Sequence, residues 1–173
     1  MAHHIQVILA REELIERLVK AWQHAHKLSL PQEFALIPMI RVLLEDMDEL
    51  INRQEPPPYS DFAHLSASIA EVLSDISHHG PVAYLETEYF GGAGTQSALL
   101  FHKQQLQSGP HKTETRWNQE LESYQTLPEG ASAINRVLKE LGVRRSETDD
   151  EFDSLQLGHY RGNERILKKI GKG

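Results

Sequence analysis

The 173-residue sequence contains no cysteine, so disulfide bonds, thiolate zinc sites and cysteine nucleophiles are all excluded. Its longest apolar runs are only about five residues, whereas a membrane-spanning helix needs about 20. Positive charge is also scarce, because 18 Lys and Arg stand against 25 Asp and Glu, a net charge of −7. Non-specific binding of nucleic acid or of an anionic membrane favours a basic surface. We therefore expect neither a nucleic-acid nor a membrane partner.

Several signatures of targeting and catalysis are missing as well. The N-terminal segment MAHHIQVILAREEL has no A-x-A-type cleavage site and turns acidic at once, so we do not expect it to be a signal peptide. No G-x-S-x-G elbow, Walker loop or dinucleotide-binding loop is present. The ten histidines do not follow a familiar metal-ligand spacing. We expect a soluble, cytoplasmic, bacterial protein that uses no cofactor and no metal; whether it is an enzyme stays open.

Hydrophobic periodicity predicts both helices and strands. Helices are expected at residues 11–22, 43–50, 62–76 (capped by Ser60 or Asp61) and 134–141. Strands are expected at residues 4–9, 34–37, 82–90 and 97–102. A further strand containing Leu106 is expected to end at Gly109-Pro110, and Trp117, Leu121 and Tyr124 have the spacing of a short helix.

These elements predict a single α+β domain over residues 1–173, with an antiparallel sheet of about four strands and helices packed on one face. The proline-rich segment 55–58 is a stiff connector inside this domain rather than a domain boundary. The basic segment 161–173 is expected to be a frayed tail.

The first candidate site is the glycine-rich stretch GGAGTQ after the strand at 82–90. Gly91, Gly92 and Gly94 let backbone N–H groups approach a phosphate or an oxyanion, and Thr95 adds a hydroxyl. A strand follows the stretch, however, and glycine is the usual residue where a turn requires a positive φ. A β-hairpin turn is therefore the favoured interpretation, and a phosphate site is the alternative.

The second candidate site is a pair of carboxylates on that same strand. Glu86 and Glu88 point to one side of it, about 7 Å apart by the rise of a strand. Such a pair suits general acid–base catalysis or a hard cation, or it lies on a solvated sheet face. With Tyr84 on the same face and Gln96 across the turn, these residues predict a polar concave surface, our preferred site for a ligand or a partner.

The C-terminal part of the chain is divided by charge. Residues 147–153 hold five carboxylates, among them Asp150 and Asp153, whereas residues 161–172 hold five bases. A carboxylate-rich segment on an acidic protein steers a basic partner toward it. The alternative is a charged segment that is simply solvated.

Four stretches of the sequence resemble a family of small, uncharacterised bacterial proteins. They are KLSLPQEFALIPMI (27–40), PVAYLETEYFGGAGTQSALLF (81–101), AINRVLKELGV (133–143) and DEFDSLQLGHYR (150–161). Gln156 stands where the family pattern has Gly. The resemblance carries no established activity, but it implies an immunity-type protein that neutralises a toxin. The positions that match the family pattern are Phe90, Gly91, Gly92, Gly94, Gln96, Asp150 and Asp153.

The leading hypothesis is a protein-binding module, of immunity or inhibitor type, that binds a basic protein through an acidic surface. The alternative is a small-ligand binder or an enzyme that uses the Gly91–Gly94 loop with Glu86 and Glu88. A third hypothesis is a structural protein that self-associates through exposed apolar parts of its helices. The sequence leaves the oligomeric state open.

Overall fold

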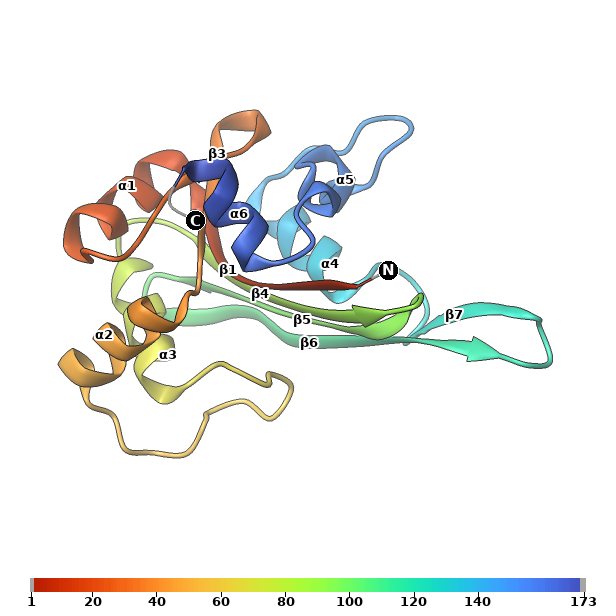
Figure 1. Cartoon of the computed structure of the whole chain (residues 1–173), viewed down its shortest axis with the longest axis horizontal. Helices are drawn as coiled ribbons and strands as arrows, with labels where there is room; N and C mark the ends of the chain where they lie inside the picture. The colour runs from red at the N-terminus through yellow and green to blue at the C-terminus, as the bar shows by residue number, and fades with distance from the viewer. Residues whose placement is uncertain (1, 172–173) are drawn as a thin grey trace.

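A seven-stranded antiparallel sheet is the middle layer of the computed structural model, which describes residues 2–171 (Figure 1). The strand order is β2-β3-β1-β4-β5-β6-β7. The strands are β1 (His3–Arg11), β2 (Leu28–Ser29), β3 (Phe34–Pro38), β4 (Val82–Phe90), β5 (Ala93–His102), β6 (Gln105–Asn118) and β7 (Ser123–Leu127). The predicted α+β class and antiparallel sheet are confirmed. The prediction of about four strands is wrong.

Helices cover both faces of the sheet, so the prediction of helices on one face is also wrong. One face packs against α1 (Glu12–Ala21), α2 (Arg41–Ile51) and α3 (Ala67–Ile76). The other packs against α4 (Ala133–Leu141), α5 (Glu151–Ser154) and α6 (Asn163–Ile170). Two short 3₁₀ helices, η1 (Pro31–Glu33) and η2 (Leu157–His159), complete the described elements.

Alternation along the strands builds the two hydrophobic cores. In β1, the side chains of Ile5, Val7 and Leu9 enter the core with α4 and α6, whereas Ile8 and Ala10 enter the core with α1, α2 and α3. The sequence signal for this arrangement is a set of four-residue apolar runs, because a strand buried on both faces needs apolar residues at successive positions. These runs are VILA (7–10), FALI (34–37), VAYL (82–85) and ALLF (98–101).

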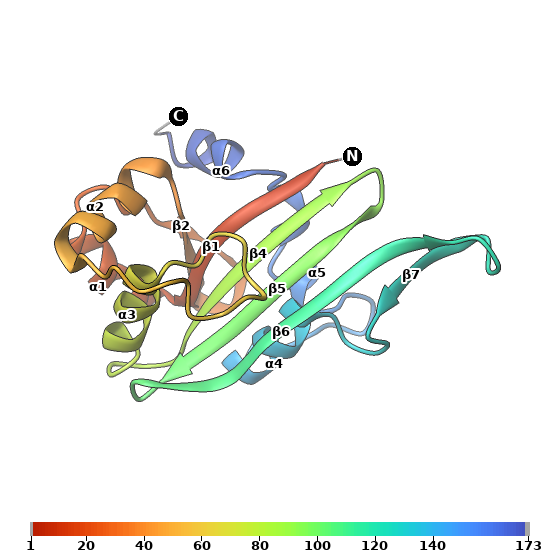
Figure 2. The same cartoon turned by 90° about the horizontal axis from the view of Figure 1, so that it is seen from below.

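The helix expected from residue 62 begins later, because Ser66 caps α3 by accepting a hydrogen bond from the Ile69 N–H. The residues before Ser66 form a loop that carries the buried side chains of Phe62 and Leu65. Figure 2 shows this loop crossing in front of the sheet, over β1 and β4. Two apolar residues at helical spacing therefore belong to a packed loop rather than to a helix.

The C-terminal end of β6 and β7 form a narrow arm, residues 114–129, that projects beyond the rest of the sheet (Figures 1 and 2). β6 does not end at Gly109-Pro110 but continues to Asn118, with register irregularities opposite Leu100. The last five residues of β6 pair with β7. On its other side, β6 pairs with β5 only as far as Thr115. The predicted helix through Trp117, Leu121 and Tyr124 is wrong, since Trp117 and Tyr124 are a cross-strand pair.

The basic C-terminal segment forms α6, whose Ile166 is fully buried. Asn163 at its start accepts a hydrogen bond from the Gln6 N–H and donates to the carbonyls of Gln6 and Met39. Residues 172 and 173, the end of the predicted basic tail, lie outside the described residues. None of the helices in residues 2–171 combines the length and the apolar character needed to cross a membrane.

Candidate functional site

Tyr84, Glu86 and Glu88 do share one face of β4, as predicted. Tyr84 is buried among the apolar residues of that face, its ring 5.6 Å from the Phe62 ring. Burial, the charge of Glu86 and a hydrogen bond to Glu86 all raise the pKa of Tyr84 well above its ordinary value. The phenol therefore remains protonated and donates to Glu86 Oε1 over 3.0 Å.

Glu86 holds the loop that precedes α3. Its carboxylate accepts hydrogen bonds from the backbone N–H groups of Ala63 and His64, each at 2.9 Å, in addition to the one from Tyr84. Ser97 Oγ, opposite Glu86 on β5, donates to the Asp61 carbonyl of the same loop over 2.5 Å. Glu86 is 7% exposed. A buried carboxylate with three hydrogen-bond donors stabilises the fold. Because the Glu86 oxygens already accept these hydrogen bonds, they are not free to act as a catalytic base.

A polar cavity of about 290 Å³ lies between this loop and the sheet, and we call it the sheet cavity. Glu88 lines it, but Tyr84 and Gln96 do not, so the predicted concave surface exists with other members. The other lining residues come from β1, β4, β5, β6 and the loop. They are His4, Gln6, Ser60, Asp61, Phe62, Ala63, His64, Glu86, Thr87, Thr95, Ser97 and Lys112. The His4 and His64 rings both line the cavity and are arranged edge to face, with their centroids 6.1 Å apart.

Gln96 lies on the opposite face of the sheet, where it helps to cap α4. Its Oε1 accepts from the Ile134 N–H over 3.4 Å, and Thr113 Oγ1 accepts from the Ala133 N–H over 3.2 Å. The Ser132 side chain accepts from the Asn135 N–H. The first N–H groups of a helix have no partner within the helix. Gln96 thus has a structural role, separate from Glu86 and Glu88.

Asp150 joins the same cluster through Asn135. The Asn135 amide donates to Asp150 Oδ2 over 2.8 Å and accepts from the Phe152 N–H over 2.9 Å, while Asp150 Oδ1 accepts from the Asp153 N–H. Three of the four quoted stretches therefore meet at one place, through Gln96, Asn135 and Asp150. A cavity of about 470 Å³ lies beside them. The hydrogen bonds that Gln96, Asn135 and Asp150 make at the start of α4 and α5 explain their positions, and no catalytic role is needed.

Asp153 is the second predicted residue of the acidic segment. Partial burial and the charges of Asp150 and Asp149 raise its pKa, and His159 opposes this shift. Carboxylates beside a histidine are potential metal ligands. Within residues 2–171, however, no group of three His, Asp or Glu side chains is placed to hold a metal ion.

The glycine-rich stretch is a turn between β4 and β5, and it packs against the arm. The Tyr124 hydroxyl donates to the Gly91 carbonyl over 2.6 Å. At Gly92, which has a φ of +92°, a Cβ atom would overlap the Tyr124 ring. At Gly94 a Cβ atom would overlap the backbone of Glu88 and Tyr89. Close packing therefore explains these glycines, and the turn does not line the sheet cavity.

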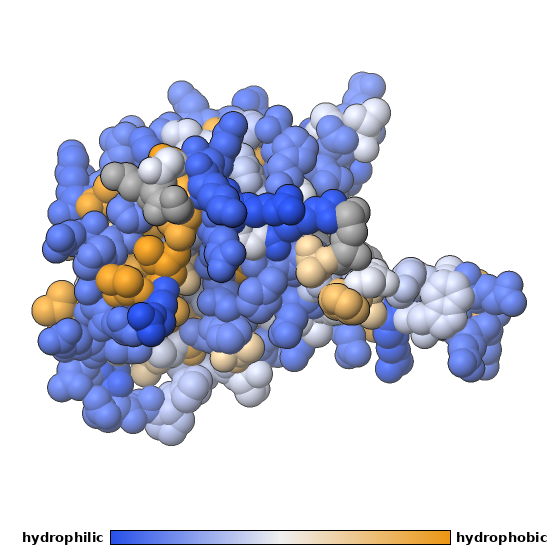
Figure 3. Space-filling model, in the orientation of Figure 1, coloured by the Kyte–Doolittle hydropathy of each residue, from blue (hydrophilic) through white to orange (hydrophobic). Residues whose placement is uncertain are grey.

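The arm exposes apolar side chains that sequence reasoning assigned to a helix. The Trp117 and Tyr124 rings meet edge to face at 5.2 Å and are 52% and 50% exposed. Leu121, at the tip, and Phe90, beside the turn, are even more exposed. Residues 114–129 also hold four carboxylates and one base. Figure 3 shows the arm as a narrow extension with a neutral to hydrophilic surface. The sequence signal for these strands is a β-branched or aromatic residue at every second position, in TETRWN (113–118) and in the first four residues of SYQTL (123–127).

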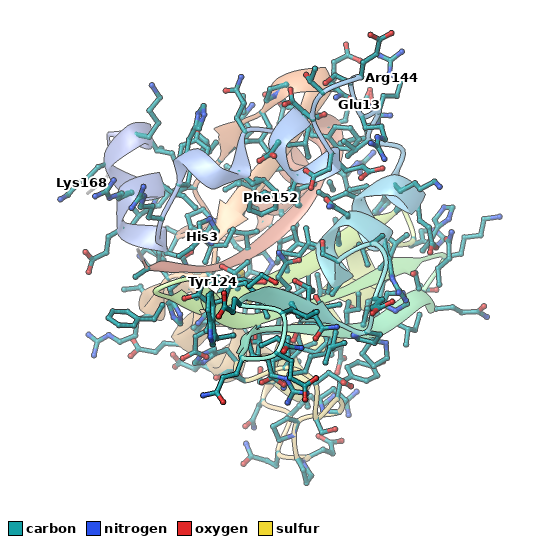
Figure 4. The ribbon with its side chains drawn as sticks, turned by 90° about the vertical axis from the view of Figure 1, so that its right-hand side faces the viewer. His3, Glu13, Tyr124, Arg144, Phe152 and Lys168 are labelled. Carbon is teal, nitrogen blue, oxygen red and sulfur yellow. The ribbon has the colours of Figure 1, made fainter. Side chains whose placement is uncertain are left out.

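At the same end of β4, His3 of the neighbouring strand β1 pairs with Tyr89 and connects the N-terminus to the C-terminal helices. Its ring nitrogens lie 2.7 Å from Thr87 Oγ1 and 3.3 Å from the Leu157 carbonyl, and its ring lies 5.7 Å from that of Phe152. In the view along the arm, His3 and Phe152 lie above the sheet and Tyr124 lies on the near side (Figure 4). Burial lowers the pKa of His3.

Comparison of the chain with models of protein families, with curated proteins and with solved structures gives no match.

Proposed function

We propose that the chain is a protein-binding module that captures a basic protein through the arm. The observation that carries this proposal is the exposed Trp117–Tyr124 pair on a projecting hairpin. Exposed aromatic side chains in a cluster are typical of protein interfaces, where Trp and Tyr supply much of the binding energy. Apolar side chains that stay exposed to water forgo the favourable free energy that burial against a partner would give.

Charge supports a basic partner. The arm carries Glu114, Glu120, Glu122 and Glu129 against Arg116 alone. The acidic segment 147–153 and the end of β7 line the same 470 Å³ cavity at the base of the arm, through Thr126 and Asp150. A surface of one sign accelerates association with a partner of the opposite sign and makes binding depend on salt.

The shape of the arm favours an inhibitor-type module. A narrow hairpin can enter a concave surface of a partner, such as the cleft of a toxin, and block it. This form of the proposal agrees with the immunity-type role that the sequence resemblance implies. It makes Gly91 and Gly92 part of the binding surface through their contact with Tyr124, together with the exposed Phe90 that precedes them.

The test is quantitative capture from a lysate of the source organism at low and high salt, with identification by mass spectrometry. We expect a basic protein that is captured at low salt, and that Leu121→Ala and Trp117→Ala each release. The matched control is Leu50→Ala, because Leu50 is 74% exposed on α2, away from the arm. Loss of capture with Leu50→Ala but not with the arm variants would contradict the proposal. So would the absence of any salt-dependent partner.

Charge reversal gives a second arm of the experiment. Glu120→Lys with Glu122→Lys should weaken capture, whereas Glu45→Lys with Glu49→Lys on α2, which changes the net charge by the same amount, should leave it unchanged. Glu86 is unsuitable for this purpose, since its carboxylate holds the loop before α3. Equal effects of the arm and α2 reversals would mean that net charge, rather than the arm, determines binding.

A further inference from the structure

We propose that the sheet cavity binds a small zwitterion of the free amino acid class. This site is separate from the arm, and its ligand does not depend on the proposed protein partner. The cavity combines a defined floor, a fixed roof and opposite charges at two places on its wall.

The floor is set by strand register. Gln6, Glu86, Ser97 and Lys112 form one row across β1, β4, β5 and β6. The next row, two residues further along, contains His4, Glu88 and Thr95. Because residues two apart on a strand point to the same face, all of these side chains lie on the side of the loop. The cavity is therefore built on paired strands, which hold polar groups in fixed positions.

The roof is fixed by the middle of the first row. Glu86 binds the N–H groups of Ala63 and His64, and Ser97 binds the Asp61 carbonyl. Phe62, between these contacts, is buried against Tyr84. Four anchoring contacts over four successive loop residues hold the loop at a set height above β4 and β5. A cavity that exists before binding costs a ligand little ordering free energy.

The remaining polar groups of the cavity floor are in the second row and, as Lys112, at the end of the first row. Among residues 2–171, the side chains of Glu88, Thr95 and Lys112 make no hydrogen bond or ion pair. By strand spacing and rise, the Cα atoms of Glu88 and Lys112 are about 12 Å apart, too far for a relaxed direct ion pair. Their charged ends can instead approach one molecule from two sides.

These groups specify the chemistry of the ligand. Glu88 accepts hydrogen bonds from an ammonium group, Lys112 donates to a carboxylate, and Thr95 between them can do either. A volume of about 290 Å³ is at the lower limit of about 300 Å³ for pockets that hold drug-sized ligands. A free amino acid has the required size and both charges. Its side chain would lie toward the His4 and His64 rings.

The experiment is a thermal-shift screen of the full chain with the twenty amino acids, each at a millimolar concentration. n-Propylamine and sodium propionate serve as probes that carry one charge only. We expect at least one amino acid to raise the midpoint by several degrees, because a ligand that binds only the folded state stabilises it. Glu88→Gln and Lys112→Met should each abolish the shift, and Lys112→Arg should keep most of it.

Matched controls separate binding from general charge effects. Lys103→Met removes a lysine at the β5–β6 turn and Glu122→Gln removes a carboxylate at the arm, and neither residue lines the cavity. Both should respond to the amino acid as the wild type does. The proposal is wrong if no amino acid shifts the midpoint. It is also wrong if a single-charge probe acts equally well or if the cavity variants keep the full shift. The cavity variants at Glu88 and Lys112 leave residues 114–129 of the arm unchanged, so capture of a protein partner remains a separate result.

Discussion

Replacing Glu86 by Ala should cost far more stability than the same replacement of Glu88, two residues along the same face. Glu86→Ala removes the acceptor of three hydrogen bonds, whereas Glu88 accepts none within residues 2–171. Hydrogen bonds to charged groups contribute about 1.5–3 kcal/mol each. Ala63 and His64 are exposed, so water can replace the carboxylate at their N–H groups. Tyr84 is fully buried, and its hydroxyl would lose its partner.

The expected cost of Glu86→Ala is therefore about 3 kcal/mol, made up of one orphaned buried hydroxyl and two hydrogen bonds exchanged for water. Glu88→Ala should change the free energy of unfolding by less than about 0.5 kcal/mol, as exposed substitutions usually do. Glu86→Gln should lie between the two, because the amide keeps one acceptor oxygen but places an NH₂ group against a donor.

Urea denaturation followed by tryptophan fluorescence measures these differences, with the slope m held common to the three variants. Limited proteolysis gives an independent readout, since the loop over residues 59–66 should become the first cleavage site in Glu86→Ala only. Equal losses for Glu86→Ala and Glu88→Ala would refute the reasoning. A large loss without new cleavage in the loop would show that the carboxylate acts elsewhere.

Three further predictions follow from single positions. Burial lowers the pKa of His3 below its value in the unfolded chain, so the unfolded state binds more protons. The free energy of unfolding should therefore fall as the pH drops below about 6.5. His3→Gln should flatten this dependence in denaturation curves from pH 7.5 to 5. Gly94→Ala should cost about 3 kcal/mol, because the new Cβ would overlap the β4 backbone, whereas Gly80→Ala has room and should be nearly neutral by thermal denaturation. Gln156→Gly should raise the free energy of unfolding by up to about 1 kcal/mol, since Gln156 has a φ of +59°, and an unchanged value would mean the backbone there is not strained.

Local patterns in the sequence predict the individual elements well. The alternation of VAYLETEYF gives β4 and the faces of its side chains, and the helical spacing of the apolar residues in 134–141 gives α4. Both signals act within a few residues, so they are readable without knowing the partners. Gln156 has a left-handed conformation, with a φ of +59°, which glycine adopts without steric cost.

The candidate sites were only partly predictable. Sequence reasoning placed Glu86 and Glu88 on one face, but it could not show that Glu86 is occupied by Ala63 and His64, which are more than twenty residues away. It also grouped Gln96 with these carboxylates, although strand alternation puts Gln96 on the opposite face, at the start of α4. The exposed aromatic pair of the arm was missed because Trp117, Leu121 and Tyr124 fit helical spacing by coincidence.

The sequence by itself determined the class of fold, the absence of cysteine chemistry and the positions of most helices and strands, because these depend on composition and on periods of two or 3.6 residues. Tertiary structure alone decided the seven-strand order, the second layer of helices and the extension of β6 into an arm. It also decided which polar side chains meet around the sheet cavity. Strand pairing and helix docking join residues far apart in the chain, so their free energy is set by the contacts of the whole fold rather than by any one segment.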